Sequence, residues 1–222
     1  AFLKDRSRRR KQGLPPELRP PALEDRSANA HHYLRHDSDW VTAVLTVTTD
    51  ADQIPIAPGR LDQEEVREGR RTRVFRNEVP IQNFFSIQSG RYAVQSETWT
   101  RPGGPPVQLA VYHHPPHTNN VPRMLAAMKA SLEVFNERLS PYQFDQFRIL
   151  EFPAYASFAQ SFANTVPYSE AIGFIQDFDD AEGDRKIDQV TFVTAHEIAH
   201  QWWAHQVIGA DKQGSTLLSE TC

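Results

Sequence analysis

Residues 194–203 read Thr-Ala-His-Glu-Ile-Ala-His-Gln-Trp-Trp. This stretch is the most informative part of the sequence, because it combines two histidines and a glutamate at helical spacing. On a helix, His196 and His200 lie about 40° apart on one face, so both imidazoles can reach one metal ion. Glu197 projects beside them, placed to take a proton from water at that ion. Asp188 is a suitable N-cap for such a helix and Gly209 a suitable stop. The pattern therefore predicts a metal site on a helix over about 189–208.

The alternative is a solvated helix that carries two surface histidines. The flanking residues argue against it because they are apolar: Phe192, Val193, Ala195, Ala199, Trp202 and Trp203. A helix with such flanks is expected to be buried, and unpaired buried imidazoles cost several kcal/mol. A bound metal removes this conflict, so the sequence favours the metal site.

A zinc site of this kind needs a third protein ligand and an open position for water. Two acidic residues follow His200, namely Asp211 and Glu220. The residues alone leave both as candidates.

The stretch 194–203 resembles the zinc helix of the aminopeptidase N family of gluzincin zinc metallopeptidases. That family takes its third ligand from the following helix, with eighteen residues between it and the second histidine, a spacing that lands here on Ser219. A loop longer by one residue within 208–216 makes Glu220 the expected ligand. The resemblance thus implies Zn²⁺ held by His196, His200 and Glu220, with Glu197 as the general base.

A second segment also resembles this family, which places a Gly-Ala-Met-Glu-Asn strand ahead of the zinc helix. Here residues 168–175, Tyr-Ser-Glu-Ala-Ile-Gly-Phe-Ile, occupy that place, and Glu170 lies 26 positions before His196. Only Glu170, Gly173 and the apolar tail match. The resemblance implies that Glu170 binds the free α-amino group of a peptide substrate; without it, Glu170 is an ordinary carboxylate at a strand edge.

The rest of the chain predicts an α+β fold. Residues 1–37 are polar and Pro-rich, as in a linker or wrapping arm. Residues 38–105 predict an antiparallel β module, because apolar and polar residues alternate from Trp40 onward. Residues 106–222 predict helices and strands of a second unit. The expected strands are 41–48, 72–76, 82–87, 91–99, 107–113, 147–152 and 171–176.

Two helices are expected in the second unit besides the one that carries the zinc motif. An apolar stripe runs along the first of them, with Asn120 as its cap, Pro122 in its first turn and an end at Ser140-Pro141: Leu125, Met128, Leu132, Phe135 and Leu139. The acidic segment 177–185 reads as a loop, and a new helix begins near Ser215.

The resemblance also implies a domain division. The β module would be the end of a saddle-like N-terminal domain. Residues 106–222 would be the first part of a thermolysin-like zinc peptidase domain, truncated at its C-terminus. Because Glu220 lies two residues from the end, where helices fray, we expect the chain alone to be inactive.

Composition limits the partners. The formal charge is −4, which argues against nucleic-acid binding, and no apolar run approaches the length of a membrane span. The segment 53–59, with the rest of the pattern, resembles a bacterial subgroup fused to ABC-transporter-permease-like membrane segments. That resemblance implies a soluble unit held at a membrane by its parent chain. The remaining histidines are expected at surface positions or away from the metal: His31, His32, His36, His113, His114, His117 and His205.

These observations favour an aminopeptidase that hydrolyses N-terminal residues from peptides. An endopeptidase would share the zinc helix without needing Glu170. A non-catalytic sensor or scaffold domain of a transporter-permease-like membrane protein would keep the fold, but it would not need Glu197. A β-sandwich interaction module would explain 40–105 and leave the zinc helix without a purpose.

Overall fold

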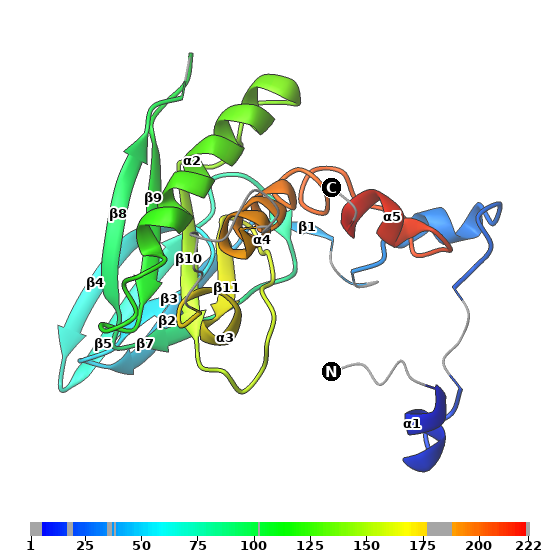
Figure 1. The fold of residues 1–222 in the computed structure, drawn as a ribbon, viewed down its shortest axis with the longest axis horizontal. Coiled ribbons are helices and arrows are strands. Elements are labelled where there is room, and N and C mark those ends of the chain that lie inside the picture. The colour runs from blue at the N-terminus through cyan, green and yellow to red at the C-terminus, as the bar shows by residue number, and fades with distance from the viewer. Residues whose placement is uncertain are drawn as a thin grey trace.

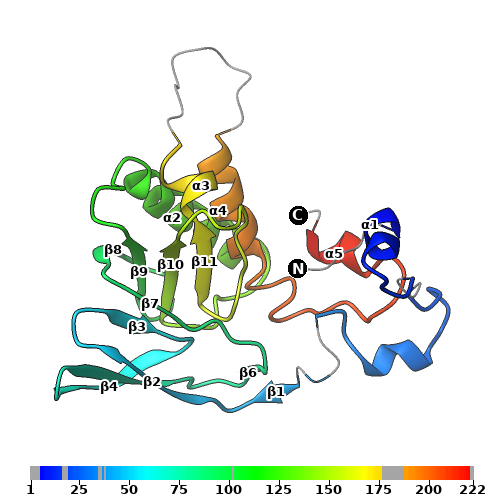
Figure 2. The same cartoon turned by 90° about the horizontal axis from the view of Figure 1, so that it is seen from below.

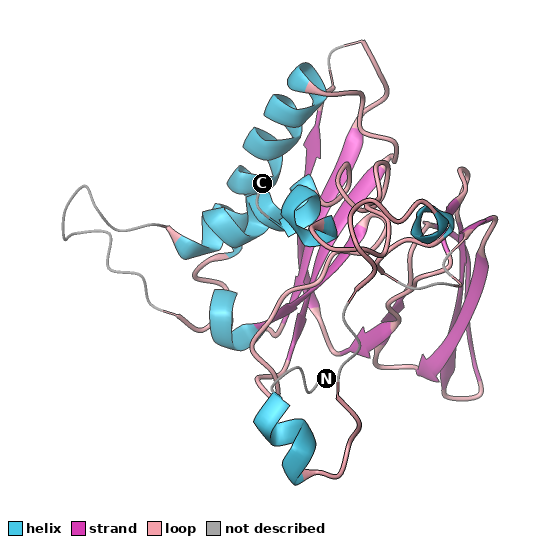
Figure 3. Ribbon diagram, turned by 90° about the vertical axis from the view of Figure 1, so that its right-hand side faces the viewer, coloured by secondary structure: helices cyan, strands magenta, loops and turns pink. Residues whose placement is uncertain are grey.

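The computed structural model describes residues 6–16, 20–34, 37, 39–101, 103–176 and 188–220. The expected loop 177–185, His36 and Cys222 lie outside these ranges. A four-stranded sheet occupies the middle of the molecule, with helices on one side and the β module on the other (Figures 2 and 3). The predicted α+β class is confirmed.

Residues 40–90 of the expected β module form three small antiparallel sheets, and the name is kept below for these residues. β2 (Val44–Asp50), β5 (Arg70–Arg76) and β4 (Arg60–Arg67) form the largest, in the order β2-β5-β4. β1 (Trp40–Val41) pairs with β6 (Ile81–Gln82), and β3 (Ile54–Ile56) pairs with β7 (Gln88–Gly90). The strands expected at 41–48 and 72–76 are present in β1, β2 and β5. The prediction of a strand over 82–87 is wrong beyond Gln82, because only Ile81 and Gln82 pair with another strand, β1.

The central sheet has the order β11-β10-β9-β8. β8 (Ala93–Trp99) runs antiparallel to β9 (Val107–His113), whereas β9, β10 (Gln146–Phe152) and β11 (Thr165–Ser169) are mutually parallel. The boundary expected at 105/106 therefore falls between two paired strands of one sheet. The domain division itself stays a proposal.

Helices α2 (Val121–Arg138) and α4 (Gln189–Ala199) pack together and enclose the main core with this sheet (Figure 1). Fully buried side chains of the core come from all these elements: Leu109, Val111, Met124, Met128, Leu132, Phe147, Ile149, Val166, Val190 and Ile198. The stripe predicted for α2 is buried at Leu125, Met128 and Leu132 and partly buried at Phe135, but the prediction is wrong for Leu139, which is the C-cap and is exposed. Asn120 holds the N-cap position, but its side-chain amide donates to the Gly173 and Gln176 carbonyls instead of capping the helix.

Three expectations about the zinc-motif region are wrong. The segment 171–176 is no strand, because β11 ends at Ser169 and Glu170 begins the helical turn α3 (Glu170–Gly173). Helix α4 ends at Ala199, long before Gly209, and His200 is its C-cap. Phe192 is 57% exposed, so it does not belong to the buried face of α4.

The N-terminal arm contains α1 (Arg6–Lys11) and a 3₁₀ turn (Ser27–Ala30). The later part of the arm lies beside the segment that leads into α5 (Ser215–Glu220), the helix expected near Ser215, whereas α1 lies apart from α5 (Figure 1). The arm is joined to the segment before α5 by backbone hydrogen bonds, from Tyr33 N to Gly209 O and from Asp211 N to His31 O. No described helix is long and apolar enough to cross a membrane.

Candidate metal centre

His196 and His200 are brought together at the end of α4. Asp188 begins the helix as predicted, since its carboxylate accepts a hydrogen bond from the Thr191 backbone N–H at 3.0 Å. The Nε2 atoms of His196 and His200 lie 3.1 Å apart. His200 is buried, whereas His196 is only half-buried beside the ring of Phe192.

The third side chain at this point is Glu220, which α5 carries to the two histidines. Its Oε2 lies 3.6 Å from the Nε2 atom of each imidazole. Four ligands placed tetrahedrally about 2.0–2.2 Å from a zinc ion are roughly 3.3–3.6 Å from one another. The two distances of 3.6 Å fall in this range and the 3.1 Å between the imidazole nitrogens is slightly shorter, so the three donor atoms fit such an ion with a small adjustment. Asp211 lies in the loop before α5 and is not one of the three clustered side chains.

The ring of His200 is oriented by its second nitrogen. Nδ1 lies 3.1 Å from the Trp203 carbonyl oxygen, which can only accept, so Nδ1 carries the proton and Nε2 presents its lone pair. Burial lowers the pKa of His200, against the opposing effect of Glu220. Burial thus favours the neutral imidazole that binds metals, and the hydrogen bond to Trp203 leaves the Nε2 lone pair facing the other two donor atoms.

Glu197 is placed beside this donor set and stays separate from it. Its side chain is buried, and Oε2 has no hydrogen-bond partner among the described residues. Burial, with a smaller contribution from the charge of Glu220, raises the pKa of Glu197 to about 8. A buried carboxylate with a raised pKa next to a metal-type donor set is suited to accept and return a proton.

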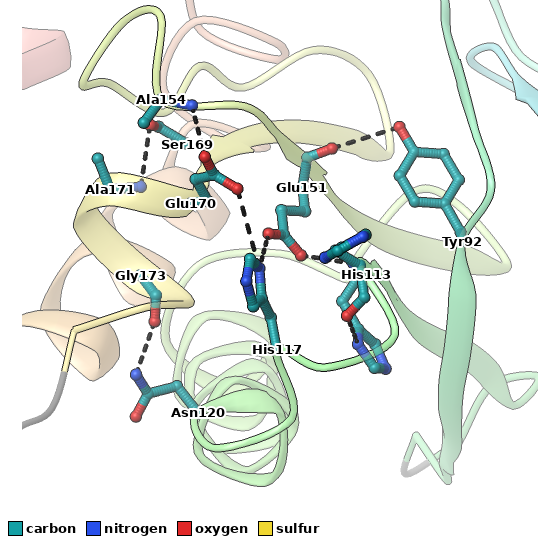
Figure 4. Close-up of polar contacts among 11 residues, drawn as sticks. Tyr92, His113, His117, Asn120, Glu151, Ala154, Ser169, Glu170, Ala171 and Gly173 are labelled. Carbon is teal, nitrogen blue, oxygen red and sulfur yellow. Dashed lines mark hydrogen bonds and ion pairs between the residues drawn. The ribbon is translucent and has the colours of Figure 1, made fainter.

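Glu170 lies elsewhere, at the carboxyl end of β11. Ser169 caps the short helix α3, and Glu170 is its first residue. The carboxylate accepts a hydrogen bond from the Ala154 backbone N–H at 2.9 Å, and its other oxygen lies 3.8 Å from Nδ1 of His117 (Figure 4). Glu170 is therefore held in place and is partly accessible.

The sequence analysis missed a group of polar side chains near Glu170. His117 was expected at the surface, but it contacts the buried carboxylate of Glu151, and His113 beside it is fully buried. The signal was present in the sequence. Glu151 interrupts the apolar run Phe-Arg-Ile-Leu-Glu-Phe of residues 147–152, and a buried carboxylate requires a partner.

Neither the family models nor the curated proteins match this chain. Solved structures do match it. The fold is similar to that of an M1 zinc metallopeptidase from Deinococcus radiodurans (TM-score 0.64, 21% identity), over 83% of this chain and 39% of that one. It is also similar to Legionella pneumophila aminopeptidase A in complex with aspartic acid (TM-score 0.68, 19% identity), over 78% and 21% of the two chains.

A third match is a two-domain M1 zinc metallopeptidase mutant bound to L-arginine (TM-score 0.65, 22% identity, 83% and 39% coverage). At these identities the similarity establishes a shared fold. The chain spans about two fifths of the length of the M1 metallopeptidases that it matches.

Proposed function

We propose that this chain forms the zinc-binding part of a metallopeptidase site that hydrolyses N-terminal residues from peptides. The observation that carries the proposal is the convergence of His196, His200 and Glu220 at donor distances suited to zinc, with Glu197 buried beside them. The fold shared with M1 zinc metallopeptidases, some of them with bound amino acids, supports the same class of reaction.

In this proposal, each side chain has one task. Zinc at the three ligands supplies Lewis acidity toward water and a peptide carbonyl. Glu197 accepts the proton of the attacking water and returns it to the leaving amine. Its Oε2 is buried and has no hydrogen-bond partner among the described residues, so this oxygen is available for the proton. Glu170 pairs with the α-ammonium group of the substrate and so sets the cleavage at the first peptide bond.

The metal site is tested by zinc content. His196→Ala and His200→Ala are each expected to lose one equivalent of zinc, measured by inductively coupled plasma mass spectrometry after dialysis. His114→Ala, at an exposed histidine away from these ligands, serves as the control and should keep it. Full zinc content in both variants would end the proposal.

The catalytic part is tested with Glu197→Gln, in the polypeptide that carries these residues and with amino-acyl amide substrates. The side-chain amide that replaces the Glu197 carboxylate cannot accept the proton of the attacking water. Turnover should therefore fall by at least about a hundredfold while zinc stays bound. If the zinc is lost together with the activity, Glu197 is a ligand. If turnover is unchanged, Glu197 is not the general base. If the unsubstituted polypeptide shows no turnover at all, the non-catalytic sensor or scaffold is favoured instead. A link to permease-like membrane segments stays part of the proposal and rests on residues 53–59 and the pattern around them.

A further inference from the structure

A second group of metal-type side chains lies at one edge of the central sheet. β9, β10 and β11 are adjacent and parallel, so their carboxyl ends meet. His117 follows the end of β9, Glu151 is the last residue but one of β10, and Glu170 comes directly after β11 (Figure 4). In sheets with parallel strands, ligands bind at this edge.

The three side chains turn their donor atoms toward one another. Nδ1 of His117 lies 2.5 Å from Oε1 of Glu151 and 3.8 Å from Oε2 of Glu170. One ligand atom from each residue falls within 4.8 Å of the other two. A shift of about 1 Å in the partly exposed side chains of His117 and Glu170 brings the three atoms to the spacing of ligands around one ion.

Each carboxylate is oriented by a backbone amide. Oε2 of Glu151 accepts a hydrogen bond from His114 N at 2.6 Å, and Oε1 of Glu170 accepts one from Ala154 N at 2.9 Å. One oxygen of each carboxylate is thereby fixed, and the other faces His117. Outer hydrogen bonds of this kind are what orient the ligands of metal sites.

The charge and the access to the group also suit a cation. Two carboxylates face a single imidazole, and no described lysine or arginine forms an ion pair with either carboxylate. The nearby Arg91 instead contacts Asp52 at 2.6 Å. A cavity of about 380 Å³ borders the group, and its lining includes Glu151, Glu170, Tyr92 and also Arg91, which is paired with Asp52. It gives an ion a path of entry and room for water ligands.

We propose that His117, Glu151 and Glu170 bind a second divalent ion of the first transition row, such as Mn²⁺ or Zn²⁺. One imidazole nitrogen and two carboxylate oxygens suit ions of this class, and water fills the remaining positions. The ion replaces the proton between His117 Nδ1 and Glu151. It also uses the Glu170 oxygen proposed above for a substrate ammonium, so the ion and the ammonium compete. The binding itself does not depend on the proposed peptidase activity.

The experiment removes the first site and asks whether an ion still binds. In the double variant His196→Ala/His200→Ala, Mn²⁺ is titrated and the free ion is followed by electron paramagnetic resonance; Zn²⁺ is titrated by calorimetry. About one equivalent should bind. Adding His117→Ala or Glu151→Gln should weaken this binding at least about tenfold. Adding His114→Ala, which leaves the backbone amide to Glu151 intact, should not.

Absence of binding in the double variant overturns the proposal, and so does binding that His117→Ala and Glu151→Gln leave unchanged. Circular dichroism establishes whether each variant is folded. If Glu151→Gln fails to fold, His117→Ala decides, because His117 lies in a turn at the surface and is only partly buried. Failure at the first site appears in a different measurement, the zinc content of the single variants His196→Ala and His200→Ala.

Discussion

His200 and His205 both lie in the segment that follows α4, yet their surroundings give them different chemistry. His200 uses one ring nitrogen for the Trp203 carbonyl and turns the other toward His196 and Glu220. His205 is completely enclosed, with Nε2 3.3 Å from the carbonyl of Ser161. Burial lowers the pKa of His205 to about 4. His205 is thus a neutral structural residue and lies outside the donor group, as expected, although α4 ends at Ala199 and helical spacing is not the reason.

The lowered pKa of His205 predicts an effect of pH on stability. An unfolded histidine takes up its proton near pH 6.5, and the folded one only near pH 4, so the unfolded state binds more protons between these values. The free energy of unfolding should therefore fall by up to about 3 kcal/mol as the pH drops from about 6.5 to 4. Urea unfolding at several pH values, compared with His205→Gln, measures this. Equal pH dependence in both proteins would contradict it.

The identity of the third zinc ligand can be tested by substituting Glu220 and Asp211 separately. Since Glu220 Oε2 lies 3.6 Å from both imidazole nitrogens, Glu220→Ala should weaken zinc binding by more than about tenfold. Asp211→Ala should change it little, because Asp211 is outside the donor group. Competition with a chelator measures both affinities. The opposite ranking would move the third ligand to the loop before α5.

At the scale of elements, the loop between β10 and β11 holds α4 in place. Ser161 Oγ donates to the carbonyl of Glu197 at 2.9 Å, and Gln201 Nε2 donates to Ser161 Oγ at 2.7 Å and to Phe162 O at 2.9 Å. Gln201 Oε1 in turn accepts from Asn164 N at 2.9 Å. These contacts fix the end of α4, where both histidines are, relative to the central sheet.

Gln201→Ala should lower the free energy of unfolding by about 2–4 kcal/mol, because it leaves the buried Ser161 hydroxyl, the Phe162 carbonyl and the Asn164 amide without this partner. Gln189→Ala, at an exposed glutamine that begins α4, is the matched control and should change it by less than about 0.5 kcal/mol. Chemical denaturation measures both. If the two variants are equally stable, the loop does not hold the helix.

At the scale of the whole molecule, one buried guanidinium joins the β module to the central sheet. Arg148 of β10 donates through one nitrogen to the carbonyls of Ala57 and Gly59 at 2.8 and 3.1 Å. The same nitrogen contacts Asn164 Oδ1 and Thr165 Oγ1, each at 3.0 Å. Burial lowers the pKa of Arg148 to about 10, so it stays charged at neutral pH. Gly59, with a φ of 106°, brings its backbone close to that of Arg76.

Arg148→Met should destabilise the protein by about 3 kcal/mol or more, because the carbonyls of the β module lose a charged donor. Hydrogen exchange should also quicken in β3 more than in α4, since the link to the β module is what is lost. Arg60→Met, at an exposed arginine paired with Glu78, should cost less than about 1 kcal/mol. Similar losses in the two variants would show that Arg148 does not join the two parts.

Local sequence patterns were sufficient to predict the helices and strands that bury one regular face. The stripe from Leu125 to Leu132 is the buried face of α2, and the run 107–113 is β9 with the predicted bounds. The α+β class follows from such segments. Asp188 was also predictable as a cap, because capping involves residues only three positions apart. The candidate metal residues His196 and His200 were found in the same way, from a spacing of one helical turn.

Tertiary contacts decided the rest. β4 was not predicted because its charged residues are exposed along the whole strand, and pairing with β5 is what makes it a strand. The group of His117, Glu151 and Glu170 joins residues up to 53 positions apart, since 170 − 117 = 53, and no local period reports that distance. Parallel strands bring such residues together only when the sheet forms. The sequence alone therefore determined what depends on neighbours along the chain, and the tertiary structure determined which distant side chains share one site.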